Sequence, residues 1–169
     1  MKPIFIEKRM WGDTEYVREL YAGDDVPDGF RITQSQAVCF ISEGSILLYE
    51  EQGGVFGLPG GTIEPNEKPE EALRREILEE ANADVVRFGL FGYVKVWKSK
   101  IPENVDIQLR YWADVTLRDG PVQDPCHQSV GRIVVTPEEA PEKLGWGTWG
   151  VVHVRTAVAE WKRKQAHDT

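Results

Sequence analysis

Residues 60–83 read GGTIEPNEKPEEALRREILEEANA, and this stretch decides the fold. Its glycine pair indicates a turn in which the backbone comes close to neighbouring groups. Pro69 favours the start of a helix, because a first helical turn does not need the N–H that proline lacks. Asn82 readily takes the left-handed conformation that ends a helix. We therefore expect a glycine turn followed by a helix from Pro69 to about Ala81.

A helix over these residues has an acidic edge beside an apolar edge. At about 100° per residue, three carboxylates share an arc of about 100°, and they belong to Glu76, Glu79 and Glu80. The adjoining apolar stripe consists of Leu73, Ile77 and Ala81. The apolar edge is expected to pack on a sheet while the acidic edge presents its clustered carboxylates.

The clustered glutamates indicate a divalent cation. Like charges four residues apart destabilise a helix by roughly 0.2–0.5 kcal/mol per pair, and a cation among them reverses that effect. Glutamate oxygens are hard ligands suited to Mg²⁺ or Mn²⁺. A glycine carbonyl from the preceding turn is placed to complete the coordination sphere. Glu67 is placed to receive the guanidinium of Arg75 and to steady the loop.

The spacing of the whole string is more specific than its acidic part. An Arg-Glu-x-x-Glu-Glu run alone is most often a solvated helix surface. The complete string fixes six positions, which are Gly61, Glu67, Arg75, Glu76, Glu79 and Glu80. Its accidental rate is on the order of one in ten million per start position.

This string resembles the signature of the Nudix hydrolase family, Gly-x5-Glu-x7-Arg-Glu-apolar-x-Glu-Glu-x-Gly-apolar. The match forms a Nudix box over residues 61–83. One departure is visible, because Asn82 stands where the family usually has glycine. Asparagine also tolerates positive φ, so the loop–helix–loop should be preserved.

The resemblance implies an α/β fold, an α/β/α sandwich around a mixed sheet. It also implies hydrolysis of a diphosphate bond in a nucleoside diphosphate linked to another group. The implied cofactor is Mg²⁺, or Mn²⁺ in its place. Carried over to this sequence, the metal ligands are Glu76, Glu79, Glu80 and the backbone carbonyl of Gly60. The implied catalytic residues are Glu79, Glu76 and Arg75. The general base stays open between Glu79 and a residue of the irregular stretch 119–129, either Asp124 or His127.

The rest of the chain predicts one domain over residues 1–169, with a mixed sheet covered by helices. Strands are expected over 14–21, 36–42, 45–50, 85–96, 105–117 and 132–135. A brief helix is expected over 137–143. A longer helix is expected from about Thr148, with one face formed by Val151, Val154, Val158 and Trp161.

Other residues have two interpretations each. Five aromatic residues either stack on a base or belong to the core, and they are Trp97, Tyr111, Trp112, Trp146 and Trp149. Four cations either meet phosphates or lie at solvated strand edges, and they are Arg110, Lys95, Lys98 and Lys100. His153 and His167 lack neighbouring partners in the sequence. Cys126 and His127 lack the second ligand pair that a zinc site requires.

Composition excludes several function classes. The net charge is −8, from 28 acidic and 20 basic residues, which disfavours a binder of long nucleic acid. We expect no membrane span and no signal peptide, because apolar runs are short and charges come early. Cys39 and Cys126 form no disulfide framework, so a reducing, cytoplasmic location is expected. A homodimer is left open.

Two alternatives use the same fold. A module that senses a nucleotide or metabolite without turnover is one, although its inactive relatives would be expected to have lost box glutamates. An isomerase is the other, and the sequence shows no cysteine–glutamate arrangement to support it. The identity of the nucleotide-type substrate stays open.

Overall fold

The computed structural model describes residues 1–126 and 128–167. In these described residues nine strands form one sheet, and they are β1 (Phe5–Trp11), β2 (Thr14–Ala22), β3 (Arg31–Phe40), β4 (Ile46–Glu51), β5 (Val55–Gly57), β6 (Gly60–Thr62), β7 (Ala83–Lys98), β8 (Asp106–Leu117) and β9 (Ser129–Val135). The helical elements are the short η1 (Ser42–Gly44), α1 (Pro69–Ala81), α2 (Ala140–Leu144) and α3 (Gly147–His167).

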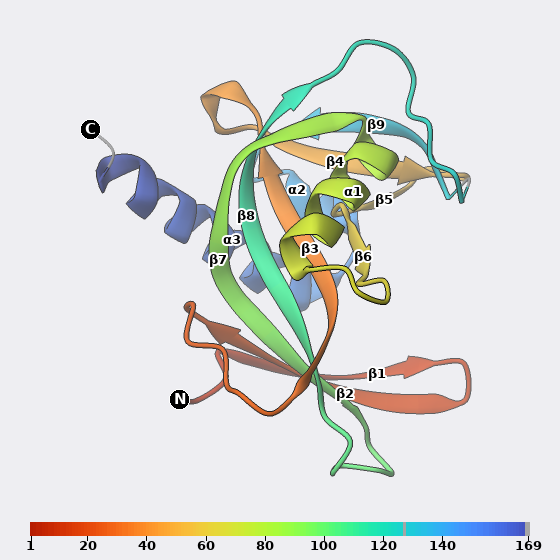
Figure 1. Cartoon of the computed structure of the whole chain (residues 1–169), viewed down its shortest axis with the longest axis vertical. Helices are drawn as coiled ribbons and strands as arrows, with labels where there is room; N and C mark the ends of the chain where they lie inside the picture. Colours follow the sequence, from red (N-terminus) through yellow and green to blue (C-terminus); the bar gives the residue numbers. More distant parts are fainter. Residues whose placement is uncertain (127, 168–169) are drawn as a thin grey trace.

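The sheet is curved and mixed, with helices on both of its faces (Figure 1). Its strands follow the order β1-β2-β7-β8-β3-β4-β5, with β6 beside β3 and β9 beside β4. β3 and β8 run parallel, whereas β7 and β8 are antiparallel. The expected α/β/α sandwich around a mixed sheet is therefore confirmed.

Alternate side chains of β3 point to opposite layers of the core. Ala37 packs in the same buried cluster as Leu73 of α1. The next residue, Val38, packs with Val154 and Ala157 of α3. The sheet therefore has an α1 face and an α3 face, and each is covered by apolar side chains.

Helix α1 begins and ends where the sequence indicates. Its first turn is closed by a hydrogen bond from the backbone N–H of Lys68 to Glu71, at 2.9 Å. Asn82 follows the helix with φ 47° and ψ 52°, in the left-handed region. The expected bounds Pro69–Ala81 are confirmed, and so is the role of Asn82 as the residue that ends the helix.

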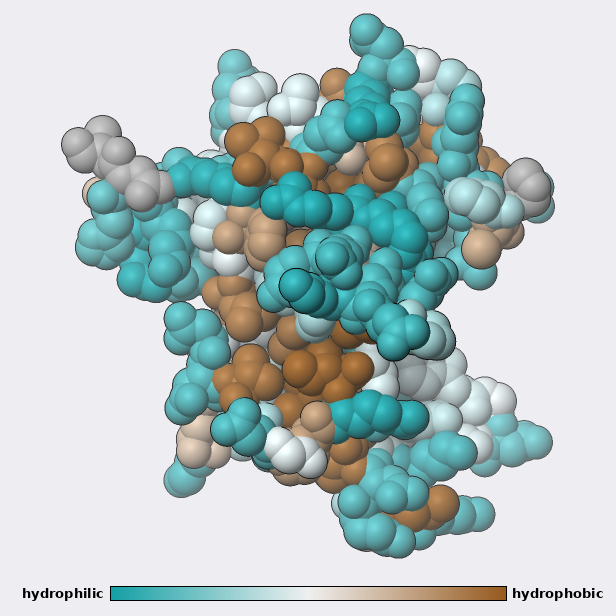
Figure 2. All heavy atoms as spheres, in the orientation of Figure 1, coloured by the Kyte–Doolittle hydropathy of each residue, from teal (hydrophilic) through white to brown (hydrophobic). Residues whose placement is uncertain are grey.

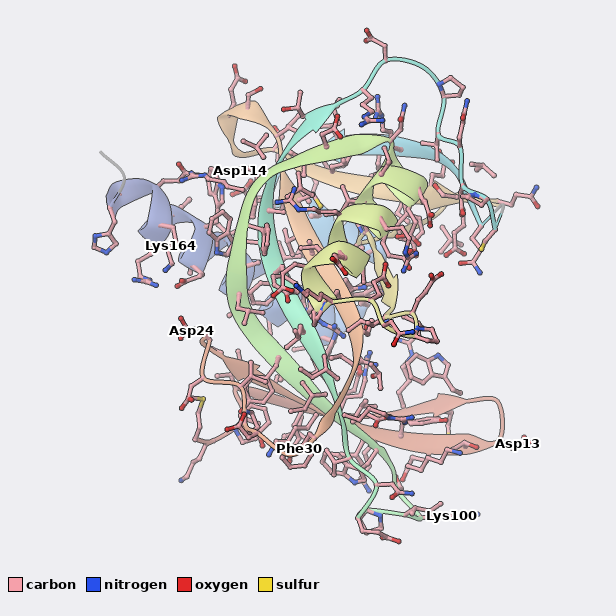
Figure 3. All side chains as sticks on the ribbon, viewed as in Figure 1. Asp13, Asp24, Phe30, Lys100, Asp114 and Lys164 are labelled. Carbon is pink, nitrogen blue, oxygen red and sulfur yellow. The ribbon has the colours of Figure 1, made fainter. Side chains whose placement is uncertain are left out.

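Strand β1 was not expected from the sequence. It forms a hairpin with β2 at the edge of the sheet, and Asp13 lies at the tip of that hairpin (Figure 3). Most β1 side chains are exposed, so its sequence lacks the apolar alternation that indicates a half-buried strand. An edge strand of this kind leaves little signal in the sequence.

The helices on the α3 face also follow the expectation in outline. The brief helix expected over 137–143 is α2, which begins later because Glu139 first accepts hydrogen bonds from Thr136. Val154 of α3 is buried, and Trp161 stacks on Phe40 of β3. Within the described residues, no helix is long and apolar enough to cross a membrane.

His153 of α3 is fully buried beside two arginines. Neither of its ring nitrogens has a hydrogen-bond partner in the described part of the chain. Burial, together with the positive charges of Arg110 and Arg18, holds the pKa of His153 well below its usual range. The imidazole is therefore neutral in the folded protein at neutral pH.

This burial predicts a loss of stability in acid. Below about pH 6.5 the unfolded chain takes up a proton at His153 that the folded chain excludes, so the free energy of unfolding falls by up to about 1.4 kcal/mol per pH unit. Denaturant unfolding of the wild type and His153→Leu between pH 7.5 and pH 5 measures this contribution. The wild type should lose more stability than the variant, and parallel pH profiles would contradict the assignment.

Candidate functional site

The acidic edge of α1 lines a cavity of about 310 Å³. Glu76, Glu79 and Glu80 all border it, and so do Gly60 and Gly61 of β6. Glu80 is only 7% exposed, whereas the other two glutamates are partly buried. Figure 2 shows a hydrophilic surface over α1, between hydrophobic regions above and below it. The structure therefore brings the four expected metal-ligating residues to one cavity.

Arg75 is the cation nearest these carboxylates. Its Nε donates to Glu67 at 2.8 Å, as the sequence indicates. Its Nη1 donates to Glu76 at 2.8 Å and to Glu79 at 3.2 Å. These bonds raise the pKa of Arg75, and the same guanidinium lowers the pKa of Glu67. Arg75 thus ties the loop before α1 to two glutamates of the acidic edge.

Glu80 lies deeper, and among the described residues no arginine donates to its carboxylate. The backbone N–H of Gly60 donates to its Oε2 at 2.8 Å. Burial raises the pKa of Glu80 to about 8, and the negative charges of Glu76, Asp124 and Glu51 act in the same direction. Burial likewise raises the pKa of Glu76. Additional positive charge in this cavity would therefore stabilise the ionised carboxylates.

Gly60 and Gly61 lie so close to neighbouring atoms that a Cβ at either position would clash. A Cβ on Gly60, whose φ is 149°, would lie 2.4 Å from the Cα of Gln36 in β3. A Cβ on Gly61 would lie 2.4 Å from Oε1 of Glu76. The first glycine lets β6 pair closely with β3, and the second lets the Glu76 carboxylate lie against the backbone of β6.

Asp124 closes the loop that forms another wall of the cavity. Its Oδ1 accepts the N–H of Cys126 at 2.9 Å. Its Oδ2 accepts the N–H groups of Gln128 at 2.9 Å and Ser129 at 2.8 Å. Three backbone donors therefore occupy the carboxylate, which favours a role in shaping the loop. His127, the other expected loop base, lies outside the described residues.

Two residues of β9 fix the end of α1. Ser129 Oγ donates to the carbonyl oxygen of Glu80 at 2.6 Å. Arg132 Nη1 donates to the carbonyls of Ala81 at 2.8 Å and Asn82 at 2.6 Å. These donors satisfy carbonyls that a helix end leaves unpaired. The sequence analysis missed both residues, because nothing in the local pattern of β9 indicates a helix cap.

The other sequence candidates divide between core and surface. Tyr111 and Trp112 are buried in clusters on opposite faces of the sheet, and Trp149 of α3 is buried against Leu20 and Val94. Trp97 and Trp146 are partly buried. Lys98 and Lys100 are exposed, and Lys100 lies at the tip of the β7–β8 hairpin (Figure 3). Nothing here supports base stacking by the buried aromatic residues.

Arg110 does not lie at a solvated strand edge, which was one of its two interpretations. It is 3% exposed, because β8 lies inside the sheet between β7 and β3. Lys95, from the same candidate group, lies over the rings of Tyr21 and Phe30. Cys39 and Cys126 are both free cysteines, the first buried and the second exposed.

A family model described as the NUDIX domain matches residues 32–153. The chain belongs to the Nudix family. The resemblance seen in the box over residues 61–83 is therefore confirmed, and α1 is the helix of that Nudix box.

Two curated relatives match shorter segments of this Nudix protein. An 8-oxo-dGTP diphosphatase from Proteus vulgaris is 45% identical over 47 residues, which is 28% of this chain and 42% of that protein. Bacillus subtilis YtkD, described as a candidate 8-oxo-dGTP diphosphatase, is 38% identical over 72 residues, 43% of this chain and 44% of that protein. The match thus spans less than half the length of these relatives.

Solved structures share the fold. A mutant of the Bacillus subtilis pyrophosphohydrolase BsRppH has a TM-score of 0.66 and 22% identity, covering 89% of this chain and 92% of the other. A NUDIX hydrolase from Nitrosomonas europaea has a TM-score of 0.60 and 20% identity, covering 77% and 90%. At these identities the likeness concerns the fold alone.

Nudix hydrolases generally need divalent metal ions, and the donors of the cavity fit this requirement. Three carboxylates and a backbone carbonyl form an all-oxygen donor set, of the kind that hard divalent cations prefer. Among the described residues, no three acidic, histidine or cysteine side chains are already close enough to hold an ion together. Arg75 holds Glu76 and Glu79, and the Gly60 N–H holds Glu80. Side-chain rotation would therefore accompany ion binding.

Proposed function

We propose that this chain is a pyrophosphohydrolase that cleaves a diphosphate bond in a nucleoside diphosphate linked to another group. The observation that carries the proposal is the cavity in which Glu76, Glu79 and Glu80 face the glycine backbone of β6. The Nudix family membership and the diphosphatases among the relatives support the same reaction class.

The proposed cofactor is Mg²⁺, with Mn²⁺ as a substitute. Glu76, Glu79, Glu80 and the carbonyl of Gly60 would hold the ion. When bound, such an ion neutralises the diphosphate and lowers the pKa of water. Burial raises the pKa of Glu80, and a cation held beside its carboxylate would favour the ionised form.

We assign the general base to Glu79 rather than to Asp124. Glu79 is partly exposed, and Arg75 donates to its carboxylate at 3.2 Å. Asp124, in contrast, accepts three backbone N–H groups, so accepting a proton would weaken its own loop. Arg75 orients the carboxylates of Glu76 and Glu79 for this role.

A turnover screen tests the proposal. The purified protein is incubated with Mg²⁺ or Mn²⁺ and with nucleoside triphosphates, dinucleotides and nucleotide sugars, and phosphate or nucleoside monophosphate release is measured. 8-oxo-dGTP comes first, because two relatives carry its name. We expect metal-dependent release from at least one substrate. Binding without release from any of them would favour a sensing module and contradict the proposed activity.

A further inference from the structure

A row of polar side chains occupies the α3 face of the sheet. Gln34 and Gln36 share this face with Val38 in β3, and Gln108 and Arg110 share it with Trp112 in β8. The strand register pairs Gln34 with Gln108, and Gln36 with Arg110. The three glutamines are partly buried, on the face whose core cluster is apolar. Such a row requires hydrogen-bond partners.

Arg110 is a buried cation without an acidic partner among the described residues. Its Nη1 donates to the carbonyl of Leu109 at 3.0 Å. Its Nε has no hydrogen-bond partner among the described residues. Burial and the nearby charge of Arg18 lower the pKa of Arg110 to about 9, so the guanidinium stays charged at neutral pH. A buried charge of this kind is costly to maintain, which calls for a role beyond packing.

Within residues 1–126 and 128–167, the one side chain to which Arg110 donates is Gln108. The bond runs from Nη2 to Oε1 of Gln108 at 2.6 Å. Because a guanidinium only donates, the carbonyl oxygen of the amide must face Arg110. The NH₂ group of Gln108 is thereby turned away from Arg110 and offered as a donor, in a half-buried position beside Gln34.

This donor lies close to the acidic cavity. Thr62 of β6 pairs with Gln34 of β3, and Gln34 pairs with Gln108 of β8. Two strand spacings, roughly 10 Å, therefore separate the backbone of Gln108 from that of Thr62. β6 is three residues long, and in the described sheet it pairs with β3 alone. A ligand with its diphosphate in the acidic cavity would have to pass this short strand for its base to reach Gln108.

We propose that Gln108, oriented by Arg110, donates its NH₂ to a carbonyl oxygen of the substrate's base and so selects 6-oxopurines such as guanine over adenine. The inference rests on the proposed function for its substrate class. Adenine presents an amino donor where guanine presents O6, so a fixed donor meets an acceptor in one base and another donor in the other. Gln36 already donates its NH₂ to the carbonyl of Leu58 at 3.4 Å. Gln34 supplies a further donor and acceptor, which suits a base edge better than a phosphate, whose oxygens only accept.

Nucleotide affinity tests this assignment without requiring turnover. GMP and AMP are titrated calorimetrically into the wild type, Gln108→Glu and Gln52→Glu, the last an exposed control in the β4–β5 turn. We expect at least about tenfold tighter binding of GMP than AMP by the wild type and the control. Gln108→Glu has the same shape but presents an acceptor and pairs with Arg110, so the preference should vanish with no loss of thermal stability.

Arg110 is a positioning residue here, and its conservative variant separates orientation from packing. Arg110→Lys keeps a donor to Gln108 and should retain part of the preference, whereas Arg110→Met should lose it. In turnover assays the effect should appear in KM for guanine nucleotides, with little change in kcat. Equal affinity of the wild type for GMP and AMP, or an unchanged preference in Gln108→Glu, overturns the inference. Selective GMP binding without hydrolysis of any nucleotide supports the inference and contradicts the proposed function.

Discussion

Replacing Glu80 by glutamine is expected to lower nucleotide turnover by about a hundredfold or more. The substitution removes the most buried of the three carboxylates while keeping the shape of the side chain. The glutamine oxygen can still accept the N–H of Gly60, so the contact between α1 and β6 is preserved. Steady-state rates at saturating Mg²⁺ measure the effect, and thermal unfolding of the metal-free protein checks the fold.

The matched control for this variant is Glu70→Gln. Glu70 lies in the first turn of the same helix, is exposed, and does not line the acidic cavity. Its substitution changes the net charge equally, so a general charge effect would lower both rates alike. Turnover of Glu80→Gln close to that of the wild type, in a folded protein, would contradict the role assigned to this carboxylate.

Replacing Gly61 by alanine is expected to abolish most activity while leaving the fold intact. The new Cβ would lie 2.4 Å from Oε1 of Glu76, closer than any real contact, so the flexible carboxylate must move away. The backbone of Gly61 is not in the left-handed region, so alanine introduces no φ strain there. We expect a loss of turnover and of divalent-ion affinity of at least about tenfold, because one ligand is displaced.

Gly131→Ala provides the comparison for this variant. Gly131 also lies beside a glutamate, but its Cβ would be 3.3 Å from Oε2 of Glu50, a distance that a small shift relieves. Circular dichroism and thermal unfolding should be close to wild type for both glycine variants. Normal ion binding and turnover in Gly61→Ala would show that the position of Glu76 is not essential.

Local features of the sequence were sufficient to predict the helix and the acidic cavity. The limits of α1 follow from Pro69 and Asn82, and the period of the helix places three glutamates along one edge. The pairing of Glu67 with Arg75 also follows from the spacing of the box. These features depend on residues fewer than about twenty positions apart, whose geometry is set by a single turn and a single helix.

Features built by distant strands could not be predicted in the same way. Ser129 and Arg132 cap α1 from β9, some fifty positions along the chain, and no pattern around them indicates that contact. A solvated strand edge was one of the two interpretations of Arg110, yet the strand order places β8 inside the sheet. Its burial, and the orientation it imposes on Gln108, depend on topology rather than on local sequence.

A Mn²⁺ titration without nucleotide measures whether the acidic cavity captures a divalent ion. Free Mn²⁺ is followed by electron paramagnetic resonance in the presence of wild type, Glu80→Gln or Glu70→Gln. We expect the wild type and Glu70→Gln to bind Mn²⁺ with similar affinity, and Glu80→Gln to bind it at least about tenfold more weakly. No Mn²⁺ captured by the wild type, or equal capture by Glu80→Gln, would contradict this expectation.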